Sequence, residues 1–200
     1  MIHPSDDPSA SPLEEARQLK FQAAHEEALK LLEELLIADP NNVEALEEVA
    51  DNELSLAQYE RAEQAARSVL ILDPRSCNAH YILGFIASHR ERFEESVREL
   101  KLANQTEPND PEILRCLGWS LFSSGDDVAG LVTLERALNL EPENPLILCD
   151  LGVVCLKQQE YSKAISLLER ALEIDPTNDR ARECLEMSRR IAVHTKEKSS

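Results

Sequence analysis

The segment that decides the fold is NLEPENPLIL, residues 139–148, in which two prolines stand three residues apart between runs of helical character. Proline inside a helix costs about 3 kcal/mol and pushes the preceding residue out of the helical region, so the chain stops one helix here and starts another. Asn144 is a good helix N-cap, and Pro145 stands at the first helical position, where its missing N–H matters little. The segment therefore ends one helix, caps the next and opens it.

The same break recurs along the chain with a period of 34 residues. It is marked by Pro40, Pro74, Pro108, Pro142 and Pro176. A boundary two residues after each proline divides the chain into the blocks 9–42, 43–76, 77–110, 111–144 and 145–178. Every block carries two amphipathic helical patterns and no alternating strand pattern. A fixed period of this length, together with only five glycines, predicts an all-α repeat protein.

Small residues recur at one position of the first helical pattern in every block, namely Ala16, Ala50, Gly84, Gly118 and Gly152. A mid-helix glycine costs about 1 kcal/mol relative to alanine, so we expect a close approach between helices at this position. Ala28, Ala62 and Ala164 mark the matching position of the second pattern, where the fourth block has Gly130. With Gly125 and Asp127 nearby, the fourth block predicts either a differently shaped turn or a local hinge.

Period, prolines, small positions and leucines such as Leu83, Leu117 and Leu151 resemble the tetratricopeptide repeat over residues 12–176. The departures are the absence of the first motif tryptophan, Glu15 in place of a leucine, and Gly130 in place of alanine. The resemblance implies a right-handed α-solenoid whose first helices line a concave groove that binds a peptide or helix of a partner protein. The expected parts are a disordered tail 1–11, repeats 12–42, 43–76, 77–110, 111–144 and 145–178, a capping helix 179–194, and a disordered tail 195–200.

The residues expected to line that groove contain two notable groups. Half of the eight aromatic residues fall on it, as do Arg115 and Val153; the aromatics are Tyr81, Phe85, Trp119 and Phe122. Exposed aromatic clusters are typical of binding hot spots, although packing between neighbouring first helices is the alternative. The second group is an acidic wall, or else a merely solvated acidic face, formed by Glu44, Glu47, Glu48 and Asp51. Glu112, Asp150 and Arg180 also occupy lining positions.

Composition restricts the possible partners. A net charge of −17 argues against nucleic acid and anionic membranes and favours positively charged partners. The first twelve residues do not resemble a signal peptide, and no apolar run is long enough to span a bilayer. Five cysteines without Cys-x-x-Cys spacing suit reduced thiols in a cytoplasmic protein. Cys77 and His80 lack further ligands nearby, so we expect no metal site and no cofactor.

The sequence contains no hydrolase, kinase or nucleotide-binding motif, so we expect a non-enzyme. The predicted function is a cytoplasmic adaptor or scaffold that binds a basic and hydrophobic protein segment in the groove. The alternative is a self-assembling scaffold, a homo-oligomer in which a terminus of one copy fills the groove of the next. Its electrostatic basis would be the acidic second block and the basic residues of the cap, Arg180, Arg182, Arg189 and Arg190.

Overall fold

The computed structural model describes residues 11–197, and this part of the chain consists of helices and turns without a strand. The helices are α1 (Pro12–Phe21), α2 (His25–Ala38), α3 (Val43–Ser55), α4 (Tyr59–Leu72), α5 (Cys77–His89), α6 (Phe93–Thr106), α7 (Pro111–Ser123), α8 (Asp127–Leu140), α9 (Pro145–Lys157), α10 (Tyr161–Ile174) and α11 (Asp179–Glu197). The predicted all-α solenoid is confirmed. Of the disordered tails expected at 1–11 and 195–200, residues 1–10 and 198–200 lie outside the described residues. The expectation is wrong for the remainder, because Ser11 caps α1 and residues 195–197 belong to α11.

Each first helix begins at a polar residue whose side chain accepts a hydrogen bond from a backbone N–H two or three residues further on; these caps are Ser11, Asn42, Ser76, Asp110 and Asn144. Directly before three of the break prolines stands an aspartate whose side chain accepts a hydrogen bond from the backbone N–H two residues further on, as Asp73 does from Arg75 (3.0 Å); the other two are Asp39 and Asp175. These local bonds satisfy backbone groups that a helix end leaves unpaired. The cap and the proline together explain the abrupt end of each repeat.

The two helices of each pair are joined by three residues, of which the middle one has a left-handed backbone. The left-handed residues are Ala23, Ala57, Glu91, Gly125 and Gln159. The fourth turn therefore has the length and handedness of the others, and the expectation of a differently shaped turn there is wrong. Gly125 occupies a place that alanine fills in the first two pairs.

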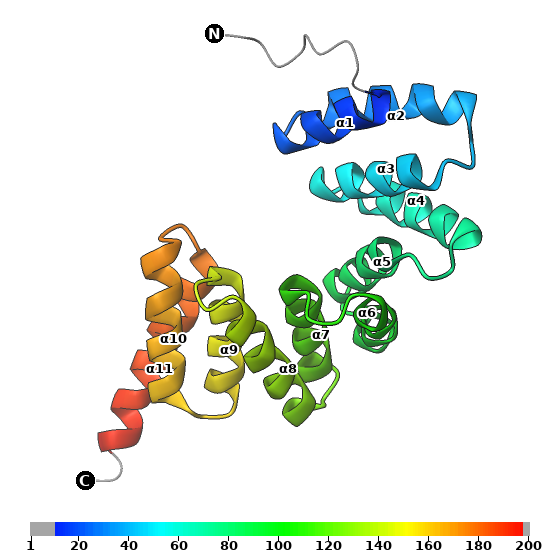
Figure 1. Cartoon of the computed structure of the whole chain (residues 1–200). Coiled ribbons are helices and arrows are strands. Elements are labelled where there is room, and N and C mark those ends of the chain that lie inside the picture. The colour runs from blue at the N-terminus through cyan, green and yellow to red at the C-terminus, as the bar shows by residue number, and fades with distance from the viewer. Residues whose placement is uncertain (1–10, 198–200) are drawn as a thin grey trace, which may run out of the picture.

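Curvature places the first helices on the inner side of the arc. Each first helix contacts the next one along the chain, from α1 through α9, and α9 contacts α11. Over the described residues, the second helices of neighbouring pairs make no such contacts. Figure 1 shows the resulting arc, with α4 and α6 on its outer side. The helices α1, α3, α5, α7 and α9 therefore form the concave side of the arc, where the groove is predicted.

Close helix packing explains the glycines. A Cβ added to Gly84 or Gly152 would lie 2.5 Å or 2.7 Å from the Cγ of a leucine on the partner helix of the same pair. In the fourth pair the backbones themselves face each other, because a Cβ on Gly130 would lie 2.7 Å from the backbone N of Phe122 and 2.9 Å from the carbonyl oxygen of Gly118. Gly130 thus serves contact between two backbones, where the other repeats accept alanine or serine.

Helix α11 runs to Glu197 and is longer than the predicted capping helix 179–194. The residues from His194 to Glu197 include no proline or glycine, so nothing in this stretch ends the helix at 194. Its Ala181 and Leu185 are buried against the last repeat, as expected of a cap. None of the described helices has the length and apolar character needed to cross a membrane.

One buried carboxyl group stands in the core where other repeats are apolar. Glu53 is fully buried, and the matching positions of the other first helices hold Leu19, Ala87, Leu121 and Cys155. Its carboxylate lies 2.9 Å from a guanidinium nitrogen of the exposed Arg61, and neither oxygen accepts a hydrogen bond. Burial, with a smaller contribution from Glu33, raises the pKa of Glu53 against the attraction of Arg61. The ionised group therefore destabilises the fold.

We expect Glu53→Leu to raise the free energy of unfolding at pH 7 by about 1–3 kcal/mol, because a buried ion pair replaced by an apolar side chain of similar size is often stabilising. Urea denaturation followed by circular dichroism measures the change. A raised pKa means that the folded protein holds the proton more tightly, so the advantage of the variant should grow as pH rises above about 4. Glu94→Leu, at an exposed position on α6, is the control, with an expected change within about 0.5 kcal/mol. A less stable Glu53→Leu protein would contradict this account.

Candidate partner-binding groove

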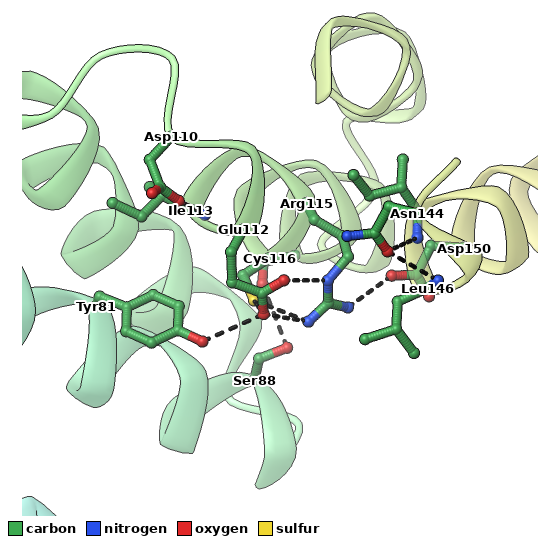
Figure 2. Close-up of polar contacts among 12 residues, drawn as sticks. Tyr81, Ser88, Asp110, Glu112, Ile113, Arg115, Cys116, Asn144, Leu146 and Asp150 are labelled. Carbon is green, nitrogen blue, oxygen red and sulfur yellow. Dashed lines mark hydrogen bonds and ion pairs between the residues drawn. The ribbon is translucent and has the colours of Figure 1, made fainter. Parts of the chain in front are cut away.

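A chain of charged side chains crosses the concave face from helix to helix. Tyr81 on α5 donates its hydroxyl hydrogen to Glu112 on α7 (3.2 Å). Arg115 grips Glu112 with two nitrogens (2.6 and 2.8 Å) and reaches Asp150 on α9 with a third (2.8 Å), as Figure 2 shows. The other oxygen of Asp150 accepts from Arg180 on α11 (2.6 Å). Four helices of the inner row are thereby tied together through side chains.

The members of this chain differ in exposure. The side chain of Asp150 is 2% exposed and that of Arg115 14%, whereas Arg180 is 46% exposed. Burial opposes the charge of Arg115, but hydrogen bonding to Glu112 and the charge of Asp150 raise its pKa. Burial would also raise the pKa of Glu112, yet hydrogen bonds from Arg115, Cys116 and Tyr81 lower it. The charges alternate and cancel, which is the condition for keeping such groups buried.

A cavity of about 240 Å³ opens at the Asp150 end of this chain. Its lining comes from α5, α7, α9 and α11, and consists of Phe85, Ser88, His89, Arg115, Cys116, Trp119, Asp150 and Arg180. The guanidinium carbon of Arg180 lies 4.3 Å from the centre of the Trp119 ring, within cation–π range. The cavity therefore combines an aromatic wall with one buried carboxylate and two guanidinium groups.

The structure separates the predicted aromatic residues. Phe85 and Trp119 line the cavity with Arg115. Tyr81 lies 6.2 Å from Phe85, ring centre to ring centre, and lines a neighbouring cavity of about 210 Å³. Phe122 is half-buried and packs against the core of the last two repeats.

Val153 differs from the prediction, because it is only 7% exposed. It belongs to a core cluster that also contains Ala181 and Leu185 of α11. The inner row continues past α9 with this capping helix, so α11 covers positions of α9 that an end repeat would otherwise expose. Val153 is therefore a core residue and not part of the groove surface.

The predicted acidic wall is paired within the chain. Arg17 contacts Glu44 and Glu48 (both 2.9 Å), and Lys20 contacts Glu48 (2.6 Å) and Asp51 (3.1 Å). Glu47 accepts a hydrogen bond from the hydroxyl of Ser76. The four acids lie together on α3 as predicted, but two cations of α1 already neutralise part of their charge. They do not form an open acidic surface.

Among the described residues, no three histidine, cysteine or carboxylate side chains gather as metal ligands would. All five cysteines are free thiols. Burial raises the pKa of Cys77 to about 11, with nearby acids adding to the effect, and that of Cys149 also to about 11. These thiols are protonated at neutral pH and are weak nucleophiles.

Comparison with known protein families identifies the last of the five repeats. Residues 145–178, which hold α9 and α10, match the family model described as tetratricopeptide repeat. Helix order, turn length and the small buried positions are shared by all five helix pairs described above. The chain is a tetratricopeptide repeat protein.

Solved structures resemble this tetratricopeptide repeat protein over most of its length. A thermophilic tetratricopeptide repeat protein of Thermus thermophilus is 23% identical, with a TM-score of 0.69, over 88% of this chain and 96% of that one. MamA of Desulfovibrio magneticus is 21% identical, with a TM-score of 0.68, over 85% and 98%. For pilF of Pseudomonas aeruginosa the values are 18%, 0.72, 88% and 86%. Identities this low establish a shared fold, and no curated protein matches the sequence.

The central role of Asp150 and Arg180 in this tetratricopeptide repeat protein was not predicted, although both stand on lining positions. A signal for it does exist in the sequence. Opposite charges on lining positions about one repeat apart form the pairs Arg17–Glu48, Lys20–Asp51, Arg115–Asp150 and Arg180–Asp150, with separations of 31, 31, 35 and 30 residues. A search for such pairs would have shown that cations of α1 neutralise the acids of α3. It would also have predicted the ion pairs of Asp150 with Arg115 and Arg180.

Proposed function

We propose that this protein is a non-catalytic adaptor or scaffold that binds a segment of a partner protein at the Trp119 cavity. A tetratricopeptide repeat fold supports a protein-interaction scaffold in general. The observation that carries the specific site is the cavity itself, where two aromatic side chains and a set of charged groups converge on the inner face of the arc. Large aromatic side chains beside polar groups are the usual composition of a binding hot spot.

The partner segment that suits this site is basic and hydrophobic. The net charge of −17 attracts cations over the whole surface and disfavours nucleic acid. Because Arg17 and Lys20 already pair with the acids of α3, the second repeat contributes less to partner choice than the sequence indicates. We place the protein in the cytoplasm on the argument that an odd set of protonated thiols suits a reducing compartment.

The alternative, a self-assembling scaffold, is less favoured because many of the charges it would use form ion pairs within one copy. Its head-to-tail pairing needs open acids in the second repeat and open arginines on the cap. Glu48 and Asp51 are paired with α1, and Arg180, Arg182 and Arg189 each contact an acid of their own chain. Most of the charges that this pairing between copies would use are thus already paired within one copy, and of the four cap arginines only Arg190 lies outside these pairs.

We expect Trp119→Ala to weaken partner binding about 30-fold or more, since truncating an aromatic hot-spot residue typically costs 2 kcal/mol or more. The partner is identified by affinity capture from cells of the native host, and binding of the purified pair is then measured by calorimetry. Phe21→Ala is the matched control, because Phe21 is an aromatic side chain 88% exposed on α1, outside the Trp119 cavity. Equal binding by Trp119→Ala and wild-type protein would move the functional surface away from this cavity.

A further inference from the structure

The contacts of Arg180 resemble those that a binding groove makes with a side chain of a bound ligand. Arg180 projects from the capping helix α11 into the groove, where its guanidinium group stacks on Trp119 at 4.3 Å and pairs with Asp150 at 2.6 Å. Nearly half of the side chain remains exposed, whereas Asp150 beneath it is 2% exposed. The contacts of Arg180 thus combine an aromatic face and a buried carboxylate, the two features that recognise a guanidinium ion.

The position of Arg180 in its own helix does not favour a cation. It is the second residue of α11, and the positive end of the helix dipole lies at the first turn. Acidic residues are stabilised there, as Asp179 is, and basic residues are opposed. The arrangement of Arg180 is therefore accounted for by the groove and not by the helix that carries it.

Removal of Arg180 would leave the site short of one positive charge. The remaining ionic chain consists of Glu112, Arg115 and Asp150, which sum to one negative charge. The vacated space adjoins a cavity of about 240 Å³ and the face of Trp119. A planar cation that stacks and donates several hydrogen bonds fits this environment better than an ammonium ion.

We propose that Trp119 and Asp150 form a guanidinium subsite that takes an arginine side chain of the partner segment, and that Arg180 occupies this subsite in the free protein. The inference rests on the proposed function and specifies the partner chemistry at the same cavity. Because Arg180 is tethered to α11, it competes with every incoming arginine. The apparent affinity of the groove is then reduced by the fraction of time that Arg180 stays in place.

The chain has a single tryptophan, so the indole N–H resonance of Trp119 reports on this subsite alone. The probe is N-acetyl-L-arginine amide, titrated into full-length wild-type, Arg180→Ala and Arg182→Ala proteins. Arg182 is the matched control: it is equally exposed, at 46%, but contacts Asp179 and the carbonyl of Pro176. We expect Arg180→Ala to bind the probe at least about tenfold more tightly than the other two proteins. The isosteric but neutral citrulline amide should leave the resonance unshifted.

Arginine binding that is equal in all three proteins, or equal shifts by citrulline and arginine amides, would overturn the inference. Arg180→Lys is a second variant that keeps the ion pair but stacks less well, and its affinity for the probe should fall between those of wild type and Arg180→Ala. Thermal melts confirm that each variant is folded. Partner binding that needs Trp119 but arginine binding that ignores Arg180 would leave the proposed function standing without this subsite. The reverse pattern would keep the subsite and remove the proposed function.

Discussion

Gly118→Leu is expected to destabilise the protein by about 3 kcal/mol or more, because the new side chain has no space between α7 and α8. The Cβ alone would lie 2.8 Å from the Cγ of Leu134, 3.0 Å from its backbone N and 3.1 Å from the carbonyl oxygen of Gly130. Two of these three atoms belong to the backbone, which cannot rotate away as a side chain can. Urea denaturation followed by helical circular dichroism measures the loss.

Gly125→Ala is the control for the loss of a glycine as such. A Cβ at Gly125 meets nothing within 4 Å, and alanine already occupies the matching left-handed position as Ala23 and Ala57. We expect this variant to cost only about 1 kcal/mol, from its left-handed backbone. A Gly118→Leu protein as stable as Gly125→Ala would mean that α7 and α8 do not pack as closely as described.

Arg115→Ala is expected to cost about 3–5 kcal/mol, because it leaves the buried Asp150 with only the exposed Arg180 and removes the main partner of Glu112. The effect should depend on pH. Because Arg115 helps to lower the pKa of Glu112, the stability that this pair contributes is present above about pH 4 and is lost as Glu112 is protonated. The difference between wild type and Arg115→Ala should therefore shrink on acidification.

Arg98→Ala serves as the control for the loss of an arginine, since Arg98 lies exposed on the outer helix α6. Its expected cost is within about 0.5 kcal/mol at any pH. Should Arg115→Ala unfold at the same urea concentration as Arg98→Ala, the ionic chain across the inner helices would not contribute to stability.

The turn of the fourth repeat shows where one of two interpretations of a sequence pattern was wrong. Gly125, Asp127 and Gly130 together predicted an unusual turn or a hinge. In the structure Gly125 is an ordinary turn residue, and Gly130 lets two backbones meet. The sequence shows that a glycine lacks a side chain. Only the facing helix shows whether the glycine makes the backbone flexible or lets two helices pack closely.

Sequence alone determined the elements of this protein: the all-α fold, the caps and the small buried positions. These features depend on residues close together in the chain, and the same residue types recur every 34 residues, so each repeat provides the same evidence. The tertiary structure decided which charged side chains are paired within the chain and which remain exposed to a partner. Arg17 pairs with Glu48, and Arg115 and Arg180 both pair with Asp150. Glu53 is fully buried beside Arg61. Such pairings depend on the angle and offset between neighbouring helices, which fix the distances between side chains and which the period does not specify.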